Sequence, residues 1–226
     1  LYIDSAVINS ENLSFDEENG GHYKAKGGMS LVGDHRLFGS LDVQGGRVNN
    51  LLELLGKSVP NLDGSLNGAM DIAGTRDNPS VHVVGTVKDV TIDKQVVGDA
   101  EVDAGLENRK ITVKTMKLPV GDGIIAAGGS MDLDGDSDIQ VALRNVDVKQ
   151  FIPLIGKDIN ATGSVTGVVN MTGKTQNPKI ELSASLVDGS FNGVSIDQAF
   201  MLATMENRVI NIQRIQGDKG VYKLSA

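Results

Sequence analysis

The chain has 226 residues, a mass of 23.8 kDa and a formal net charge of −8, from 21 Lys+Arg against 29 Asp+Glu. Nucleic-acid binding depends on cationic side chains that neutralise phosphates, so this acidic balance excludes nucleic acid as the expected partner. The absence of Cys excludes disulfides, thiol catalysis and thiolate metal sites. Because the first residue is Leu1, we expect an excised piece of a longer protein.

Apolar residues alternate with small or polar ones along most of the chain, and this period of two is typical of half-buried β-strands. Residues 65–74 are the first clear example, and similar runs follow up to residues 210–212. The residues predicted to share the apolar side of these strands are Leu66, Met70, Ile72, Val81, Val83, Val87, Val102, Leu106, Ile111, Val113, Ile139, Val141, Leu143, Val165, Val169, Met171, Ile180, Leu182, Leu186, Ile210 and Ile212.

Turn-forming residues separate the runs, among them Asn19-Gly20, Asn78-Pro79, Asp122-Gly123 and Asn192-Gly193. Asn-Gly and Asp-Gly pairs supply the positive φ angles that tight hairpins need. The connections are too short for crossover helices, so the sheet is predicted to be mainly antiparallel, with about twelve to fourteen strands. The predicted fold class is all-β.

Two segments depart from this alternation. Residues 48–55 and 148–155 each place apolar residues on one helical face, and each is followed by a glycine, Gly56 or Gly156. Pro153 limits the second segment to a turn or two of helix. Both are predicted to be short amphipathic helices.

The sequence also contains an internal repeat. Residues 61–127 align with residues 160–226 at a constant offset of 99, with 16 of 67 positions identical. The predicted organisation is therefore the end of one repeat in residues 1–57, a complete repeat in 58–157 and the start of a third in 158–226, all within one continuous domain. Each complete repeat is predicted to have five or six strands and a short helix.

Two stretches carry a resemblance to a known family. Residues 64–81 and 163–180 each combine a glycine-spaced amphipathic strand, an Asn-Pro turn and a second amphipathic strand. This pattern resembles the repeats of the TamB family, within the AsmA-like group of bacterial envelope proteins. The resemblance implies a long β-sheet rolled into an open apolar trough, a β-taco or repeating β-groove, with short helices between the repeats.

The same resemblance implies a function and a location. It implies a non-enzymatic, inner-membrane-anchored protein that spans the periplasm of a diderm bacterium. Phospholipid would pass between the two membranes along the trough, with its acyl chains against the apolar residues named above. A BamA-like outer-membrane barrel would be a partner through other parts of the protein. An alternative implication is a scaffold that assists assembly or secretion of outer-membrane and autotransporter proteins by β-strand augmentation.

No residue pattern indicates chemistry, a cofactor or a metal. Asp132–Asp138 resembles a calcium loop, but Ser137 and Leu143 stand where Gly and Glu are needed, so a solvated hairpin turn is the better interpretation. Gly121–Ala126 matches a dinucleotide-binding string without the strand–helix context. The three histidines lie far apart in sequence. For the apolar stripe itself, an ordinary closed β-sandwich core and a structural spacer or adhesin remain the alternatives to a lipid path.

Overall fold

The computed structural model describes the chain except residues 1, 5, 19, 51–61, 93–94, 152–159, 221 and 226. It consists of two compact units, Leu1–Met116 and Lys117–Ala226, and the boundary lies within one strand. The predicted repeat boundaries after residues 57 and 157 lie outside the described residues. The division into repeats therefore stays a prediction.

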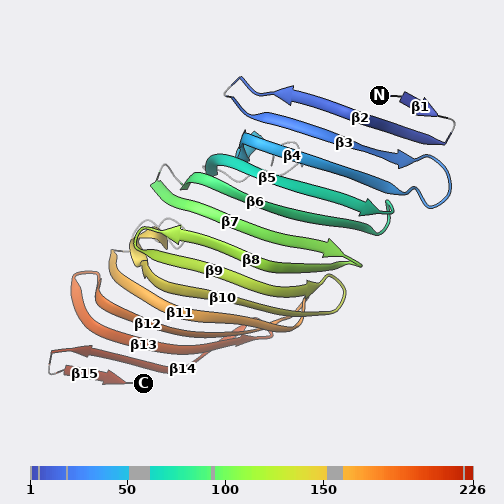
Figure 1. Ribbon diagram of the computed structural model, residues 1–226. Helices are drawn as coiled ribbons and strands as arrows, with labels where there is room; N and C mark the ends of the chain where they lie inside the picture. Colours follow the sequence, from blue (N-terminus) through green and yellow to red (C-terminus); the bar gives the residue numbers. More distant parts are fainter. Residues whose placement is uncertain are drawn as a thin grey trace. The chain divides into compact units, whose positions relative to one another are not determined.

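The first unit is built of antiparallel strands that pair in sequence order (Figure 1). These strands are β1 (Tyr2–Asp4), β2 (Val7–Asp16), β3 (His22–Ser30), β4 (Leu37–Arg47), β5 (Leu62–Gly74), β6 (Pro79–Ile92) and β7 (Gln95–Glu107). β8 (Lys110–Val120) contains the boundary between the units.

The second unit repeats this arrangement, again with antiparallel neighbours in sequence order. Its strands are β9 (Gly123–Asp132), β10 (Asp136–Asp147), β11 (Ala161–Lys174), β12 (Lys179–Phe191), β13 (Val194–Glu206), β14 (Val209–Lys219) and β15 (Tyr222–Ser225). The all-β, antiparallel prediction is confirmed, and the described part of the chain contains fifteen strands rather than the expected twelve to fourteen.

Helix is almost absent from the described residues. Residues 48–50 are helical, and the rest of the first predicted helix lies outside the described part. The second predicted helix begins as a 3₁₀ turn, Val148–Phe151, and residues 152–155 are likewise not described. A 3₁₀ turn is a common form for so short a helical segment.

β-Bulges occur near the same ends of corresponding strands in both units. The register shifts between Val43 and Gly46 in β4, and between Leu143 and Val146 in β10. The bulges contain Gly45 (φ 67°) and Asn145 (φ 52°), two residue types that adopt positive φ readily. Each bulge bends its strand and changes which residues face each side beyond it.

Corresponding elements of the two units lie 99 residues apart. β7 and β13 both have 13 residues and start at positions 95 and 194, while β8 and β14 start at 110 and 209. The hairpin turns that follow β7 and β13 have the same backbone angles, with φ 49° and 61° at Asn108 and Arg109, and 53° and 63° at Asn207 and Arg208. Two consecutive positive φ values are characteristic of a type I′ turn.

The small core of each unit lies near these bulged strand ends. In the first unit Tyr23, Val43, Val90 and Val97 are buried. In the second unit the buried residues at the corresponding strand ends are Val120, Val146 and Ala161, and Ala203 is buried as well. Most apolar strand residues outside these positions are only half-buried.

Candidate functional site

One face of the sheet in the first unit is apolar, and we call it the apolar face. The β5–β6 register sets Leu66, Met70 and Ile72 directly opposite Val87, Val83 and Val81. The β6–β7 register then sets Val81 opposite Leu106 and Gly85 opposite Val102. Because directly opposed residues project to the same side, all eight predicted groove residues of β5–β7 share this face.

The second unit has an apolar face of the same kind. Two rows of directly opposed residues cross it from β10 to β14. One row is Ile139, Met171, Ile180, Met205 and Ile210. The next is Val141, Val169, Leu182, Ala203 and Ile212. The face continues toward the bulges with Leu143, which is opposite Gly167, and with Val165, which is opposite Leu186.

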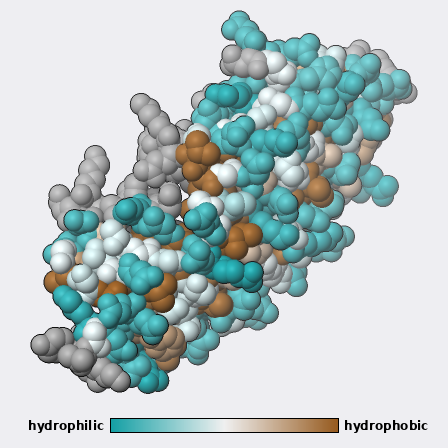
Figure 2. Space-filling view, turned by 60° about the vertical axis from the view of Figure 1, so that its left-hand side comes forward, coloured by the Kyte–Doolittle hydropathy of each residue, from teal (hydrophilic) through white to brown (hydrophobic). Residues whose placement is uncertain are grey.

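The apolar faces are incompletely covered. Of the 21 predicted groove residues, 19 are half-buried, including Ile111 and Val113 of β8, and none is fully buried. The remaining two, Ile210 and Ile212, are 68% and 62% exposed. Figure 2 shows exposed hydrophobic side chains between hydrophilic ones on one side of the molecule. A residue inside a closed sandwich core would be buried, so these faces are not packed as such a core.

The accessible surface of the chain supports the same conclusion. It measures 14466 Å², whereas a folded monomer of this mass exposes about 9,900 Å². The excess is expected where one face of a sheet has no second layer of structure against it. The sequence also contains few large aromatic side chains, with 5 Phe, 3 Tyr and no Trp.

Small residues lie at the centre of each apolar face. Gly68 is opposite Gly85 in the first unit, and Gly167 is opposite Ala184 in the second. A Cβ atom at Gly68 would lie 2.6 Å from the carbonyl oxygen of Val84, so the strands leave no room for a side chain there. Each face therefore has a low centre between larger apolar residues.

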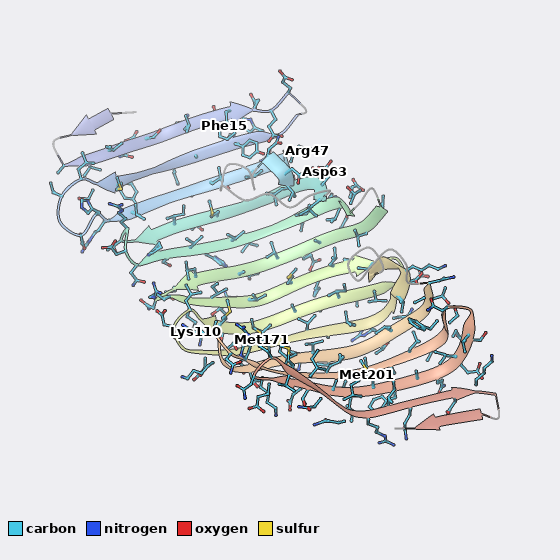
Figure 3. All side chains as sticks on the ribbon, turned by 180° about the vertical axis from the view of Figure 1, so that it is seen from behind. Phe15, Arg47, Asp63, Lys110, Met171 and Met201 are labelled. Atoms are coloured by element: carbon cyan, nitrogen blue, oxygen red, sulfur yellow. The ribbon has the colours of Figure 1, made fainter. Side chains whose placement is uncertain are left out.

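A polar cluster fixes the bulged end of the first unit. The Tyr23 ring stacks on Phe15 with centroids 4.5 Å apart, and its hydroxyl donates a 2.5 Å hydrogen bond to Glu17. Arg47 Nη2 lies 2.5 Å from Asp63 Oδ2, and its backbone N–H donates to Glu17. Figure 3 shows Phe15, Arg47 and Asp63 at neighbouring strand ends.

Burial and hydrogen bonding shift two pKa values in this cluster. Burial raises the pKa of Tyr23 to about 12, and the hydrogen bond to Glu17 acts in the same direction. Burial opposes ionisation of Glu17, but hydrogen bonds from Tyr23, Asn50 and the Arg47 backbone outweigh it and lower the Glu17 pKa. The cluster therefore holds an ionised carboxylate beside a neutral phenol. Its hydrogen bonds and its Arg47–Asp63 ion pair link neighbouring strand ends.

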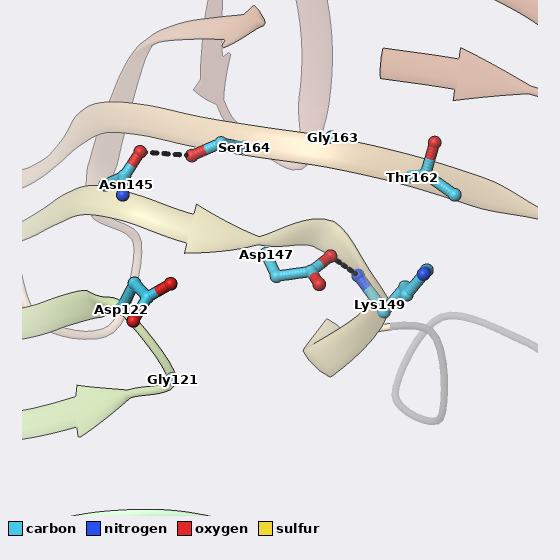
Figure 4. A pocket seen from close by; sticks show the side chains of 8 residues that line it. All are labelled: Gly121, Asp122, Asn145, Asp147, Lys149, Thr162, Gly163 and Ser164. Atoms are coloured by element: carbon cyan, nitrogen blue, oxygen red, sulfur yellow. Dashed lines mark hydrogen bonds between the residues drawn. The ribbon is translucent and has the colours of Figure 1, made fainter. Parts of the chain in front are cut away.

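The corresponding end of the second unit contains a polar hollow of about 330 Å³ (Figure 4). Asp122, Asn145, Asp147, Lys149 and Thr162 line it with three neighbouring residues. Asn145 Oδ1 accepts a 2.7 Å hydrogen bond from Ser164, and Asp147 Oδ1 accepts one of 2.9 Å from the Lys149 backbone. The hollow is open, and its mixed charges form no recognisable catalytic set.

The histidines have structural partners. His22 bonds to Asp16, and His82 Nε2 lies 2.8 Å from Asp103 Oδ1 on the face opposite the apolar one. Within the described ranges, no group of three or more His, Asp or Glu side chains could hold a metal ion. The helical segments that the structure describes include none long and apolar enough to cross a membrane.

Sequence reasoning missed a second apolar surface, on the opposite face of the second unit. The alternation assigned that face to polar residues, but the structure places Val168, Phe200 and Leu202 on it. The consecutive apolar residues of 124–127 and 200–202 are the signal that could have revealed it, since such runs cannot all face one side of a strand.

The chain matches no family model, and no curated protein or solved structure is significantly similar to it. Its function is therefore inferred from the two faces described above.

Proposed function

We propose that the chain is a segment of a lipid conduit, in which the apolar faces bind the acyl chains of phospholipids. The sheet would form an open trough, and the full protein would carry lipid across the periplasm between the inner and outer membranes. A BamA-like barrel in the outer membrane would be its partner through other parts of the protein. No step in this function requires catalysis.

The observation that carries the proposal is the incomplete burial of the apolar faces. Nineteen predicted groove residues are half-buried and two are exposed, although they are Leu, Ile, Val or Met. Soluble monomers rarely leave a contiguous apolar surface of more than a few hundred Å² uncovered, so a large one indicates a binding surface. Acyl chains fit this surface because it is apolar along several successive strands.

The physical basis of transfer is the hydrophobic effect. Each methylene exposed to water costs about 0.8 kcal/mol, so an acyl chain that crosses water unprotected meets a barrier of more than about 10 kcal/mol. A continuous apolar face would replace that exposure with contacts to Val, Leu, Ile and Met. The low centres at Gly68–Gly85 and Gly167–Ala184 would leave room for the chains.

The proposal is tested by lipid retention. The protein is produced in the periplasm of a diderm bacterium and purified without detergent, and bound lipid is identified by native mass spectrometry and by extraction. We expect phospholipid in a reproducible ratio to protein. A lipid-free protein that also rejects added fluorescent phospholipid would refute the conduit.

A matched pair of variants on β6 separates lipid binding from folding. Val83 belongs to the apolar face, whereas the adjacent Val84 projects to the other side and is 45% exposed. We expect Val83→Asp to lose most of the bound lipid, and Val84→Asp to retain it. Val169→Asp provides the same test in the second unit. Equal lipid retention by Val83→Asp and wild type, with circular dichroism unchanged, would contradict the proposal.

A further inference from the structure

The face opposite the apolar face differs between the two units. In the second unit one row of directly opposed residues crosses it from β9 to β14: Ala126, Ala142, Val168, Ser183, Leu202 and Arg214. Phe200, opposite Ser185, lies beside this row. We call Ala142, Val168, Phe200 and Leu202, with Arg144 and Arg214 at the margins, the Phe200 patch.

The corresponding row of the first unit contains three charged residues. It runs Lys24, Asp42, Ala69, Val84 and Asp103. Leu202 and Phe200 lie 99 residues after Asp103 and Glu101, at matching positions of β13 and β7. In the first unit the Asp103 carboxylate is partnered by His82 and Lys114, so this sheet face carries a charged residue at the position of Leu202. The apolar character of the Phe200 patch is therefore not a general requirement of this sheet face.

The Phe200 patch also has a shape suited to binding. A shallow hollow of about 350 Å³ lies over β10–β13, with Ala142, Ser183 and Ser185 among the small residues that line it. Val168 and Phe200 border the hollow, and both are half-buried rather than covered. Small residues beside a projecting aromatic ring create a site for one apolar side chain of a partner.

The charges at the margins indicate the partner's chemistry. Arg144 and Arg214 are both exposed, and neither guanidinium has a hydrogen-bond or ion-pair partner among the described residues. Four strand spacings separate them, or about 19 Å. The nearby carboxylate of Glu181 is paired with Lys179 at 2.6 Å. Arg144 lines the hollow, and Arg214 lies on the same face opposite Leu202. In a chain of net charge −8, two unpaired arginines on this face favour an anionic partner.

We propose that the Phe200 patch binds an acidic segment of a partner protein, in which an apolar side chain fills the hollow and flanking carboxylates pair with Arg144 and Arg214. Arginine forms bidentate pairs with carboxylates, which would set the orientation of the segment. The proposal goes beyond lipid binding and does not depend on it, because it concerns the other face of the sheet.

The first experiment is NMR titration of the full chain with a designed peptide, Gly-Glu-Glu-Leu-Phe-Gly-Leu-Glu-Glu-Gly. Its counterpart with Gln in place of every Glu is the control peptide. We expect the acidic peptide to shift the methyl signals of Val168 and Leu202 but not those of Val169 and Leu182, and to bind more weakly as salt is added. Equal binding of the Gln peptide, or shifts centred on the apolar face, would overturn the proposal.

The first unit indicates which residues this sheet face carries at the positions that correspond to 200 and 202. Leu202→Asp and Phe200→Glu introduce the residues that the first unit has at Asp103 and Glu101. Arg144→Gln, a surface change, removes one of the two charges. We expect each variant to unfold like the wild type but to raise the peptide dissociation constant about tenfold. Val84→Asp, in the first unit, should bind the peptide normally. Unchanged affinity in Leu202→Asp and Arg144→Gln would refute the patch.

Two further measurements test whether a membrane surface or a second copy of the chain occupies the Phe200 patch instead. Sedimentation with vesicles of two parts phosphatidylcholine to one part phosphatidylglycerol should show no binding that depends on Arg144 and Arg214. Analytical ultracentrifugation should show no self-association that Leu202→Asp abolishes. Arginine-dependent vesicle binding without peptide binding would assign the patch to a membrane surface, and Leu202-dependent dimers would assign it to a second copy. Either result would overturn the proposal.

Discussion

The side-chain amide of Asn78 donates a 3.1 Å hydrogen bond to Oδ1 of Asn108, which joins the β5–β6 turn to the β7–β8 turn. The same bond recurs 99 residues later, where Asn177 Nδ2 lies 2.7 Å from Asn207 Oδ1. The acceptor residues have φ angles of 49° and 53°, which Asn adopts more easily than other non-glycine residues. Each acceptor Asn therefore combines a turn conformation with a link to the neighbouring turn.

Replacement of Asn207 tests these two contributions. We expect Asn207→Ala to lower the free energy of unfolding by about 1–2 kcal/mol, because it loses the hydrogen bond and places a less suited residue at positive φ. Asn207→Gly loses the bond alone and should cost less. Urea unfolding followed by circular dichroism measures both, and equal losses would show that backbone conformation contributes nothing.

Arg208 follows Asn207 at φ 63°, a conformation in which a side chain is strained. We expect Arg208→Gly to stabilise the protein by about 0.5–1 kcal/mol, since Asn-Gly is the preferred pair in a type I′ turn. Arg208→Ala retains the strain and should change stability by less than about 0.5 kcal/mol. Thermal unfolding compares the three proteins, and a destabilised Arg208→Gly would contradict the turn assignment.

Close packing at Gly46 predicts a large effect of one methyl group. A Cβ atom there would lie 2.4 Å from the Tyr23 hydroxyl and 2.6 Å from Val43 Cγ1. We expect Gly46→Ala to lower the free energy of unfolding by about 1–3 kcal/mol, because the buried Tyr23 would have to move. Gly217→Ala is the control, since its Cβ would meet nothing closer than 3.8 Å. Similar denaturation midpoints for the two variants would refute the packing argument.

The Glu17–Tyr23 pair predicts stability losses at both ends of the pH scale. The Glu17 pKa is lowered by folding, so its contribution is present above the unfolded value near 4.5 and is lost as the pH falls below it. The Tyr23 pKa is raised to about 12, so its contribution is present below pH 10 and is lost between about pH 10 and 12. Urea unfolding across this range measures both losses.

Tyr23→Phe is the variant that separates the two groups. It should remove the alkaline loss and raise the Glu17 pKa, because the carboxylate then lacks one hydrogen-bond donor. Absorbance at alkaline pH provides an independent check, in which one of the three tyrosines should titrate near pH 12 in the wild type but not in the variant. An alkaline loss that persists in Tyr23→Phe would exclude Tyr23 as its source.

Much of the fold was predictable from local pattern. The alternation of Leu66, Met70 and Ile72 places them on one side of a strand in any antiparallel sheet, and Asn or Asp residues at turns indicate the hairpins. The register in which the strands pair could not be predicted in the same way. A pattern with period two fits any register shifted by an even number of residues, so the opposition of Leu66 and Val87 follows from the whole sheet and not from either strand.

The side-chain contacts at the bulged strand ends could not be predicted from the sequence. Tyr23 and Glu17 did not stand out as candidate residues, because their contact depends on a turn between β2 and β3 and on the bulge at Gly45–Gly46. The Phe200 patch was missed for a related reason. Its members come from β10, β11, β13 and β14, and no local pattern shows that Val168 and Leu202 lie in one row.

Local sequence is enough to predict the strand-forming segments, their turns and their apolar sides, because backbone sterics and side-chain alternation act within a few residues. Whether an apolar side chain is buried, half-buried or exposed emerges only in the folded sheet. That outcome depends on which strands become neighbours and where bulges change the facing of residues, and both are set by pairing between distant segments. The same alternation therefore produces a buried Val146 and an Ile212 that is 62% exposed.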